Sequence, residues 1–331
     1  MTGLALIGSV LGLALLVCGS SGCSSTGDGS LSYYAQAVGG HLDVLNRARA
    51  VTEVMAAADT PSLLRERLQL TQRLRDFAVA ELKLPDNNSY RRYADLQRDA
   101  VVYNVVAAPE LSLTLKTWCF PVLGCVGYRG YYRREAADAL AQDLQQAGLE
   151  TRVYGVPAYS TLGFSNWVGG DPLLNTFVNW PEPELARLLF HELAHQVAYA
   201  DDDTLFNESF ATAVERLGAR QWLQRHGDAT ALAQVALTEQ RRQDFQDFAQ
   251  RWRADLQVLY ASARSEADKR GRKATIMAAK RAEYQALKTQ RWNGFAGYDG
   301  WVERANNATL AVQAAYNDLV PQFESRGSNQ C

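Results

Sequence analysis

The spacing of hydrophobic residues divides the first 180 positions into two parts. Residues 33–87 are rich in Ala, Leu and Arg, and stretches such as "LLRERLQLTQRLRDFAVAEL" repeat apolar residues at helical spacing, which predicts two or three helices. Residues 88–180 contain "AVVYNVVAA" and "LETRVYGVPAYSTLGF", whose β-branched and aromatic residues predict strands. Between these two, "REAADALAQDLQQAGL" predicts a helix. The second part is therefore a mixed α and β region.

From Pro181 onward the pattern is almost entirely helical. In "PEPELARLLFHELAHQVAYA" the two prolines and the acidic first turn are helix start signals. A second helix, "FNESFATAVERLGARQWLQRHG", follows after an acidic loop and ends at Gly227. Residues 228–331 predict further long helices. We therefore expect an α+β, mainly helical domain over residues 33–331, divided into parts 33–87, 88–180, 181–227 and 228–331, with a small mixed sheet upstream of the histidine pair.

The N-terminal residues predict a secretion signal. Residues 4–18 are uncharged and apolar, but this stretch of about 15 residues is shorter than the ~20 that a spanning helix needs. The small residues before Cys23 resemble the lipobox of bacterial lipoproteins, in which that cysteine is lipidated. This resemblance implies a signal peptide over residues 1–23, a Ser/Gly linker over 24–32, and a lipoprotein anchored on the periplasmic side of the outer membrane.

The charge of the chain bears on its binding partners, and its cysteines bear on the compartment in which it folds. The chain has 34 basic and 36 acidic residues and no long run of one sign, so we expect no nucleic-acid partner. Cys119 and Cys125 in "CFPVLGC" can close a short disulfide loop in an oxidising compartment. Their spacing and the lack of nearby histidines disfavour a metal site at this pair.

Two of the four histidines form the motif HExxH. His191 and His195 are four residues apart, so on a helix both rings project from one face and can reach one ion. Glu192 lies about 100° around the helix, where its carboxylate can reach a water molecule on that ion. A catalytic metal of this kind usually takes three protein ligands and leaves one position open.

The third ligand has several candidates in the sequence. The aspartates at 201–203 would have to fold straight back onto the helix. Glu208 lies in the first turn of the next helix, which an antiparallel helix pair would place beside the histidines. Glu215 is seven residues further on and shares a helix face with Glu208. Either glutamate can therefore be the ligand, with the other as its neighbour.

The segments "HELAHQ" and "NESFATAVE" together resemble the gluzincin metallopeptidases, especially the alanyl aminopeptidase type. This resemblance implies a zinc cofactor bound by His191, His195 and Glu208, with Glu192 as general base and Glu215 supporting a ligand. The step from the second histidine to the ligand glutamate is 13 residues here (208 minus 195), and about nineteen in that family. The connecting loop must therefore be shorter.

The chain as a whole resembles a family of bacterial lipoproteins described as aminopeptidases, through "LPDNNSYRRYADL", "TWCFPVLGCVGYRGYY", "VPAYSTLGF" and the zinc motif. The resemblance implies a zinc peptidase that acts on peptides. The alanyl aminopeptidase type uses a tyrosine downstream of the zinc glutamate to stabilise the oxyanion, and Tyr298 and Tyr316 are the candidates for that role here. The stretch 155–164 is a candidate edge strand beside the substrate. The alternatives are an endopeptidase, another zinc hydrolase, and a non-catalytic lipoprotein whose zinc-stiffened helices form a binding or scaffold module.

Overall fold

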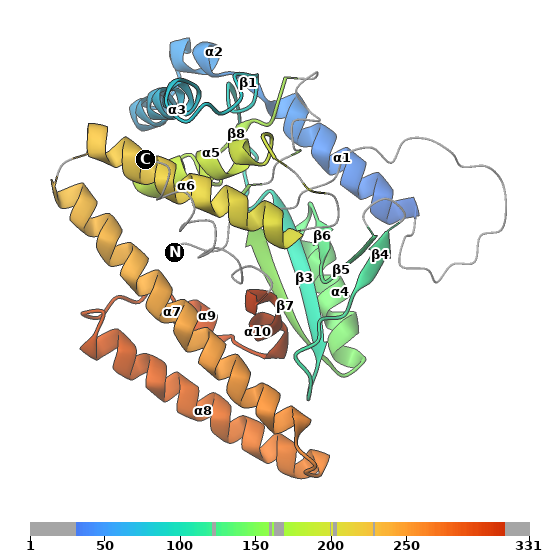
Figure 1. Ribbon diagram of the computed structural model, residues 1–331. Helices are drawn as coiled ribbons and strands as arrows, with labels where there is room; N and C mark the ends of the chain where they lie inside the picture. Colours follow the sequence, from blue (N-terminus) through green and yellow to red (C-terminus); the bar gives the residue numbers. More distant parts are fainter. Residues whose placement is uncertain are drawn as a thin grey trace.

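Helices make up most of the molecule, and the short strands lie upstream of the histidine pair (Figure 1), which confirms the α+β, mainly helical class. The computed structural model describes residues 31–120, 124–158, 161, 169–198, 200, 204–227 and 229–314. The proposed signal peptide, Cys23, Tyr316 and the aspartates at 201–203 lie outside the described residues.

Three helices form the N-terminal part, as the apolar spacing predicted: α1 (Leu31–Arg47), α2 (Val51–Ala56) and α3 (Ser62–Ala80). The inner face of α3, with Leu68, Leu74 and Phe77, packs in the same hydrophobic cluster as the histidine-bearing helix. A small sheet lies beside these helices. Its order is β1-β2-β8, and its strands are β1 (Arg49–Ala50), β2 (Arg92–Ala94) and β8 (Leu173–Leu174).

A second, antiparallel sheet has the order β6-β3-β7 and consists of β3 (Val102–Pro109), β6 (Arg129–Tyr131) and β7 (Leu149–Val156). Successive residues of β3 point to opposite faces. Val105 and Ala107 pack in one cluster with α4 (Arg134–Gln146), whereas Val106 and Ala108 pack with α10 (Asn307–Ala314). Helices therefore cover both faces, which explains why every residue of β3 except the last is buried. The predicted edge strand at 155–164 is represented by the end of β7, and most of its remaining residues are not described.

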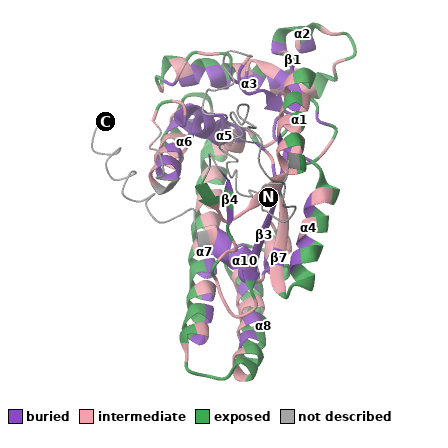
Figure 2. Cartoon of the chain, turned by 90° about the vertical axis from the view of Figure 1, so that its right-hand side faces the viewer, coloured by how far each residue is buried: buried purple, intermediate pink, exposed green. Residues whose placement is uncertain are grey.

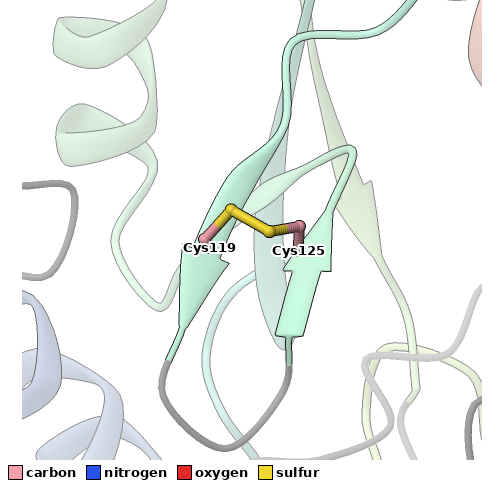
Figure 3. The surroundings of a disulfide bond; sticks show 2 residues. All are labelled: Cys119 and Cys125. Carbon is pink, nitrogen blue, oxygen red and sulfur yellow. A yellow bond between two sulfur atoms is a disulfide. The ribbon is translucent and has the colours of Figure 1, made fainter.

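The loop with the paired cysteines forms a hairpin of β4 (Trp118–Phe120) and β5 (Gly124–Val126). Cys119 lies opposite Cys125 in the register, and a disulfide joins them (Figure 3). This bond fits an oxidising environment.

The C-terminal half contains α5 (Glu182–Ala194), α6 (Thr204–His226), α7 (Ala229–Ala261), α8 (Glu266–Gln290), α9 (Asp299–Glu303) and α10. Figure 2 shows that α5 is almost wholly buried, whereas α7 and α8 form a long hairpin with much of its surface exposed. Among the described residues, no helix is both long and apolar enough to cross a membrane.

Candidate metal centre

The centre lies where the end of α5 meets the start of α6. Trp222, near the end of α6, donates its indole N–H to Glu182 in the first turn of α5 at 2.8 Å. Because this bond joins the end of α6 to the start of α5, the two helices run antiparallel, which is the arrangement considered from the sequence. At Gly218 an added Cβ would lie 2.9 Å from the Phe190 ring, so the helices approach each other closely where the glycine lacks a side chain. The pairing brings Glu208 beside both histidines.

The helix α5 ends earlier than its apolar pattern predicted. It stops at Ala194, whereas the predicted helix ran to residue 200. His195 is the C-cap residue in helical conformation, and its backbone N–H still donates to the carbonyl of His191 at 3.3 Å. Both rings therefore keep their common face. The chain must turn back at once because Asn207 in α6 bonds both backbone groups of Ala200, at 2.7 and 2.9 Å.

Three ligand atoms converge at this turn. The Nε2 atoms of His191 and His195 lie 3.1 Å apart, and the carboxylate oxygens of Glu208 lie 3.5 and 3.8 Å from them. Ligand atoms bound at about 2.1 Å around a tetrahedral ion are about 3.4 Å apart. All three side chains are buried, with at most 7% of their residue surface exposed. Within the described part of the chain, this is the group of His, Cys, Asp and Glu whose geometry could hold a metal ion.

Glu215 contacts a ligand histidine from behind. Its Oε2 lies 2.8 Å from Nδ1 of His191, and its Oε1 accepts a bond from Arg187 at 2.5 Å. A carboxylate at Nδ1 holds the proton there and leaves Nε2 with its lone pair toward the ion. Arg187 also contacts Glu239 of α7. Glu208 is therefore the glutamate that completes a group of three side chains able to hold a metal ion, whereas Glu215 contacts His191 on the side away from that group.

Burial and neighbouring charges shift the pKa values of the two histidines in opposite directions. Burial opposes protonation of His191, but the adjacent carboxylates of Glu208 and Glu215 outweigh it and raise its pKa to about 10. Burial, together with His191, lowers the pKa of His195 well below its ordinary value. Protons therefore compete with a metal ion at His191, whereas His195 offers a neutral nitrogen. Arg187 and His191 outweigh burial at Glu215 and lower its pKa, which keeps this carboxylate ionised.

Glu192 differs from every other carboxylate of the centre. It is fully buried, and neither of its oxygens has a hydrogen-bond partner among the residues that the structure describes. Burial raises its pKa to about 8, against the opposing effect of His191, and the nearby carboxylates of Glu208 and Asp171 add to the rise. A buried carboxylate without partners costs free energy. The carboxylate of Glu192 is therefore available as a proton acceptor beside the three convergent side chains.

Several residues around the centre carried no recognisable sequence signal. Arg187, Asn207 and Gln196 orient the ligand-bearing segments, yet each does so through a partner that only the tertiary fold supplies. The one available signal was position: Gln196 ends "HELAHQ" and Asn207 begins "NES", so both lie next to candidate ligands in the sequence. Tyr90 and Asp171 also lie near Glu192, since both contribute to the electrostatics of this part of the core.

Of the two tyrosines suggested for the oxyanion, the structure describes Tyr298 but not Tyr316. Tyr298 stacks on Phe245 with ring centroids 3.9 Å apart and packs with Trp292 in the aromatic cluster of α7, α8 and α9. That cluster is separate from the hydrophobic cluster that contains α5. Of the two glycines that flank Tyr298 and Asp299, Gly297 lies in the turn before α9 and Gly300 lies within α9. Tyr316 lies outside the described residues.

A comparison with protein-family models matches residues 32–330 to a family described as "Putative aminopeptidase". The match takes in the helix pair, both sheets upstream of it and the C-terminal helices. Searches of curated proteins and of solved structures gave no match to the chain.

Proposed function

Because the chain belongs to this aminopeptidase family, we propose that it is a zinc-dependent peptidase that removes residues from the N-terminus of peptides. The observation that carries the proposal is the unpartnered carboxylate of Glu192 beside three convergent ligand atoms. A purely structural zinc site usually closes its fourth position with a protein ligand and has no use for such a base.

The donor set suits zinc. Two imidazole nitrogens and one carboxylate oxygen match the three-ligand arrangement of catalytic zinc sites, and His191, His195 and Glu208 supply them. When bound, zinc supplies Lewis acidity: it polarises a carbonyl oxygen and lowers the pKa of water. Glu215 fixes the tautomer and orientation of His191, so that the ligand nitrogen is ready before the ion arrives.

Glu192 moves the proton in this mechanism. Its carboxylate accepts a proton from the attacking water and then donates it to the nitrogen of the leaving amine. A pKa raised by burial supports both steps, because the acid form is then accessible near neutral pH. The peptide bond is broken by water without a covalent enzyme intermediate.

We also propose that the protein works in the periplasm, held at the outer membrane by a lipid on Cys23. The apolar N-terminal stretch and the small residues before this cysteine support the anchor. The disulfide between Cys119 and Cys125 supports an oxidising compartment. Mass spectrometry of the mature protein from bacterial membranes should find Cys23 at the N-terminus with an acyl modification.

The test of the reaction combines metal analysis with two kinds of peptide. Wild type should contain about one zinc per chain and cleave fluorogenic peptides with a free N-terminus, but not the same peptides with a blocked one. Glu192→Gln should keep the zinc and lose at least roughly 1,000-fold in kcat, because the proton acceptor is gone.

The matched control is Glu184→Gln, which removes a carboxylate from the first turn of the same helix, where it contacts Arg242. This variant should keep its activity. An active, zinc-loaded Glu192→Gln would refute the role of Glu192. Cleavage of blocked peptides would identify an endopeptidase, and a zinc-loaded wild type that cleaves no peptide would favour the binding module.

A further inference from the structure

The segment 85–91, "PDNNSYR", docks against the turn that carries the histidines. Gln196, the residue after His195, accepts a bond from the side chain of Asn87 at 2.6 Å and donates to the hydroxyl of Ser89 at 3.2 Å. From the other side, the buried guanidinium of Arg75 donates to the backbone carbonyls of Ser89 at 3.0 Å and Pro85 at 2.6 Å. The segment is thus fixed to the metal centre by specific polar contacts.

Tyr90 occupies an unusual backbone conformation in this segment. Its φ is +64°, a left-handed value that is rare for a bulky side chain. Two hydrogen bonds hold it there: its N–H donates to the carbonyl of Asp171 at 2.6 Å, and its own carbonyl accepts from Gln72 at 3.1 Å. A strained residue persists only where its surroundings determine it, and such residues gather at functional sites.

The side chain of Tyr90 is buried, with 2% of the residue exposed, and within the described part of the chain its hydroxyl has no hydrogen-bond partner. The charge of Glu192 acts on this phenol, and with burial and Asp171 it raises the pKa of Tyr90 well above its ordinary value. The hydroxyl therefore keeps its proton. The same part of the core thus contains an unpartnered donor, Tyr90, and an unpartnered acceptor, Glu192.

We propose that Tyr90 is a catalytic residue whose hydroxyl donates a hydrogen bond to the substrate carbonyl oxygen as negative charge develops on it. The inference rests on the proposed hydrolysis at the same centre. Attack of water places charge on that oxygen, and a fixed donor in a buried site stabilises it most strongly in the transition state. A hydroxyl with no partner in the fold is free for this contact, and the strained, hydrogen-bonded backbone holds it in place.

The test compares Tyr90→Phe with Tyr93→Phe in the zinc-loaded, full-length protein. Tyr93 lies three residues further on in the same hydrophobic cluster and is also buried, at 8% exposed. Tyr90→Phe should lower kcat by roughly 100-fold with KM within about twofold, and should weaken binding of a phosphinic peptide, an analogue of the tetrahedral anion, by a similar factor. Tyr93→Phe should change neither value.

Stability and metal content separate a catalytic role from a structural one. Because the hydroxyl has no partner in the fold, Tyr90→Phe should keep its zinc and melt at the wild-type temperature or above. A variant that melts lower, or does not fold, overturns the inference, because the hydroxyl would then serve the structure. Unchanged kcat and phosphinate affinity overturn it too, as does a shifted acid limb of the pH profile with phosphinate affinity intact.

The outcomes also distinguish this inference from the proposed function. If wild type cleaves peptides and Tyr90→Phe does so equally well, the role of Tyr90 is wrong and the peptidase assignment stands. If wild type cleaves no peptide but loses phosphinate affinity on Tyr90→Phe, the hydroxyl recognises a tetrahedral anion and the assigned reaction is wrong.

Discussion

The antiparallel helix pairs α5–α6 and α7–α8 differ in how deeply their charged side chains are buried. In the pair α5–α6, ten successive residues of α5 from Leu185 to Ala194 are buried, and the charged groups of the centre lie inside. In the pair α7–α8, the 25-residue helix α8 buries only Lys273, Met277 and Tyr284. Several of its ion pairs, such as Arg272 with Asp268, lie at the surface with about half of each side chain exposed, and the buried Lys273 pairs with Glu150.

The difference lies in how the charges of each helix pair are stabilised. Removing a charge from water costs several kcal/mol, so each ion inside α5–α6 needs partners, and a chain of contacts runs from His191 through Glu215 and Arg187 to Glu239. The exposed pairs of α8 are solvated and contribute little each. The buried surroundings also shift two pKa values: the carboxylates of Glu208 and Glu215 raise that of His191 against the effect of burial, and burial raises that of Glu192.

The largest effect should follow from breaking the buried chain of charges. Glu215→Gln leaves Arg187 without one of its carboxylates and His191 without its support, so the free energy of unfolding should fall by about 3–5 kcal/mol. Zinc affinity should fall by roughly 10–100-fold, because His191 is no longer oriented. Urea denaturation and competitive zinc titration measure the two effects.

The control lies on the exposed pair. Arg272→Ala removes a partner of Asp268 on α8 and should cost no more than about 0.5 kcal/mol. Equal losses from the two substitutions would contradict the contrast between buried and exposed charges.

A matched pair of glycines tests packing without charge. Gly218→Ala in α6 would place a Cβ 2.6 Å from Leu82 and 2.9 Å from the buried Phe190 ring, so it should lower stability by about 1–3 kcal/mol. Gly271→Ala in α8 meets nothing within 4 Å and should raise stability by about 0.5–1 kcal/mol through helix propensity. Melting curves of both variants give the signs, and the same sign for both would refute the contrast in packing.

The pH dependence of the chelator-treated protein should give a smaller, graded effect. The folded protein keeps a proton on His191 up to a pKa of about 10, whereas the unfolded chain loses it near 6.5. Stability from this proton is full below pH 6.5 and declines toward pH 10, and Glu192, with its pKa raised to about 8, acts in the same direction. Unfolding free energy should therefore fall by roughly 1–2 kcal/mol between pH 7 and pH 8.

The stabilisation that zinc adds should have the opposite pH dependence. Metal binding displaces the proton from His191, so the stabilisation that zinc provides should grow as the pH rises. Urea denaturation at pH 7 and pH 8, with chelator and with zinc, measures both trends. Chelator-treated stability that stays constant or rises over this interval would show that His191 does not hold the proton.

The predictions that the structure confirms depended on short-range spacing. HExxH places two rings on one face of one helix, and the next helix begins nine residues after His195 (204 minus 195). This spacing left Glu208 and Glu215 as candidates, and the resemblance to the gluzincins favoured Glu208, which the structure places beside both histidines. Apolar periodicity likewise predicted β3, α4 and the long helices. In each of these cases the information lies within one or two neighbouring elements.

The features that the sequence did not predict depend on distant contacts. Tyr90 lies 101 residues before His191, and only the docking of its segment against Gln196 brings it to the centre. The end of α5 was misplaced because Val197 continues the apolar pattern, although it is 54% exposed beyond the helix. Periodicity reports burial along one helix, and it cannot report a chain reversal that Asn207 and Ala200 impose from outside that helix.

The short step between the ligands has a consequence for assembly. All three ligand residues lie between positions 191 and 208, so a metal ion there closes only a short loop of chain. The entropy lost in closing a loop grows with its length, and contacts between near neighbours form fastest. Asn207 already ties that loop together through Ala200. If the proposed zinc site is correct, we expect the ion to enter as soon as the two adjacent helices meet, before the segment that carries Tyr90 docks.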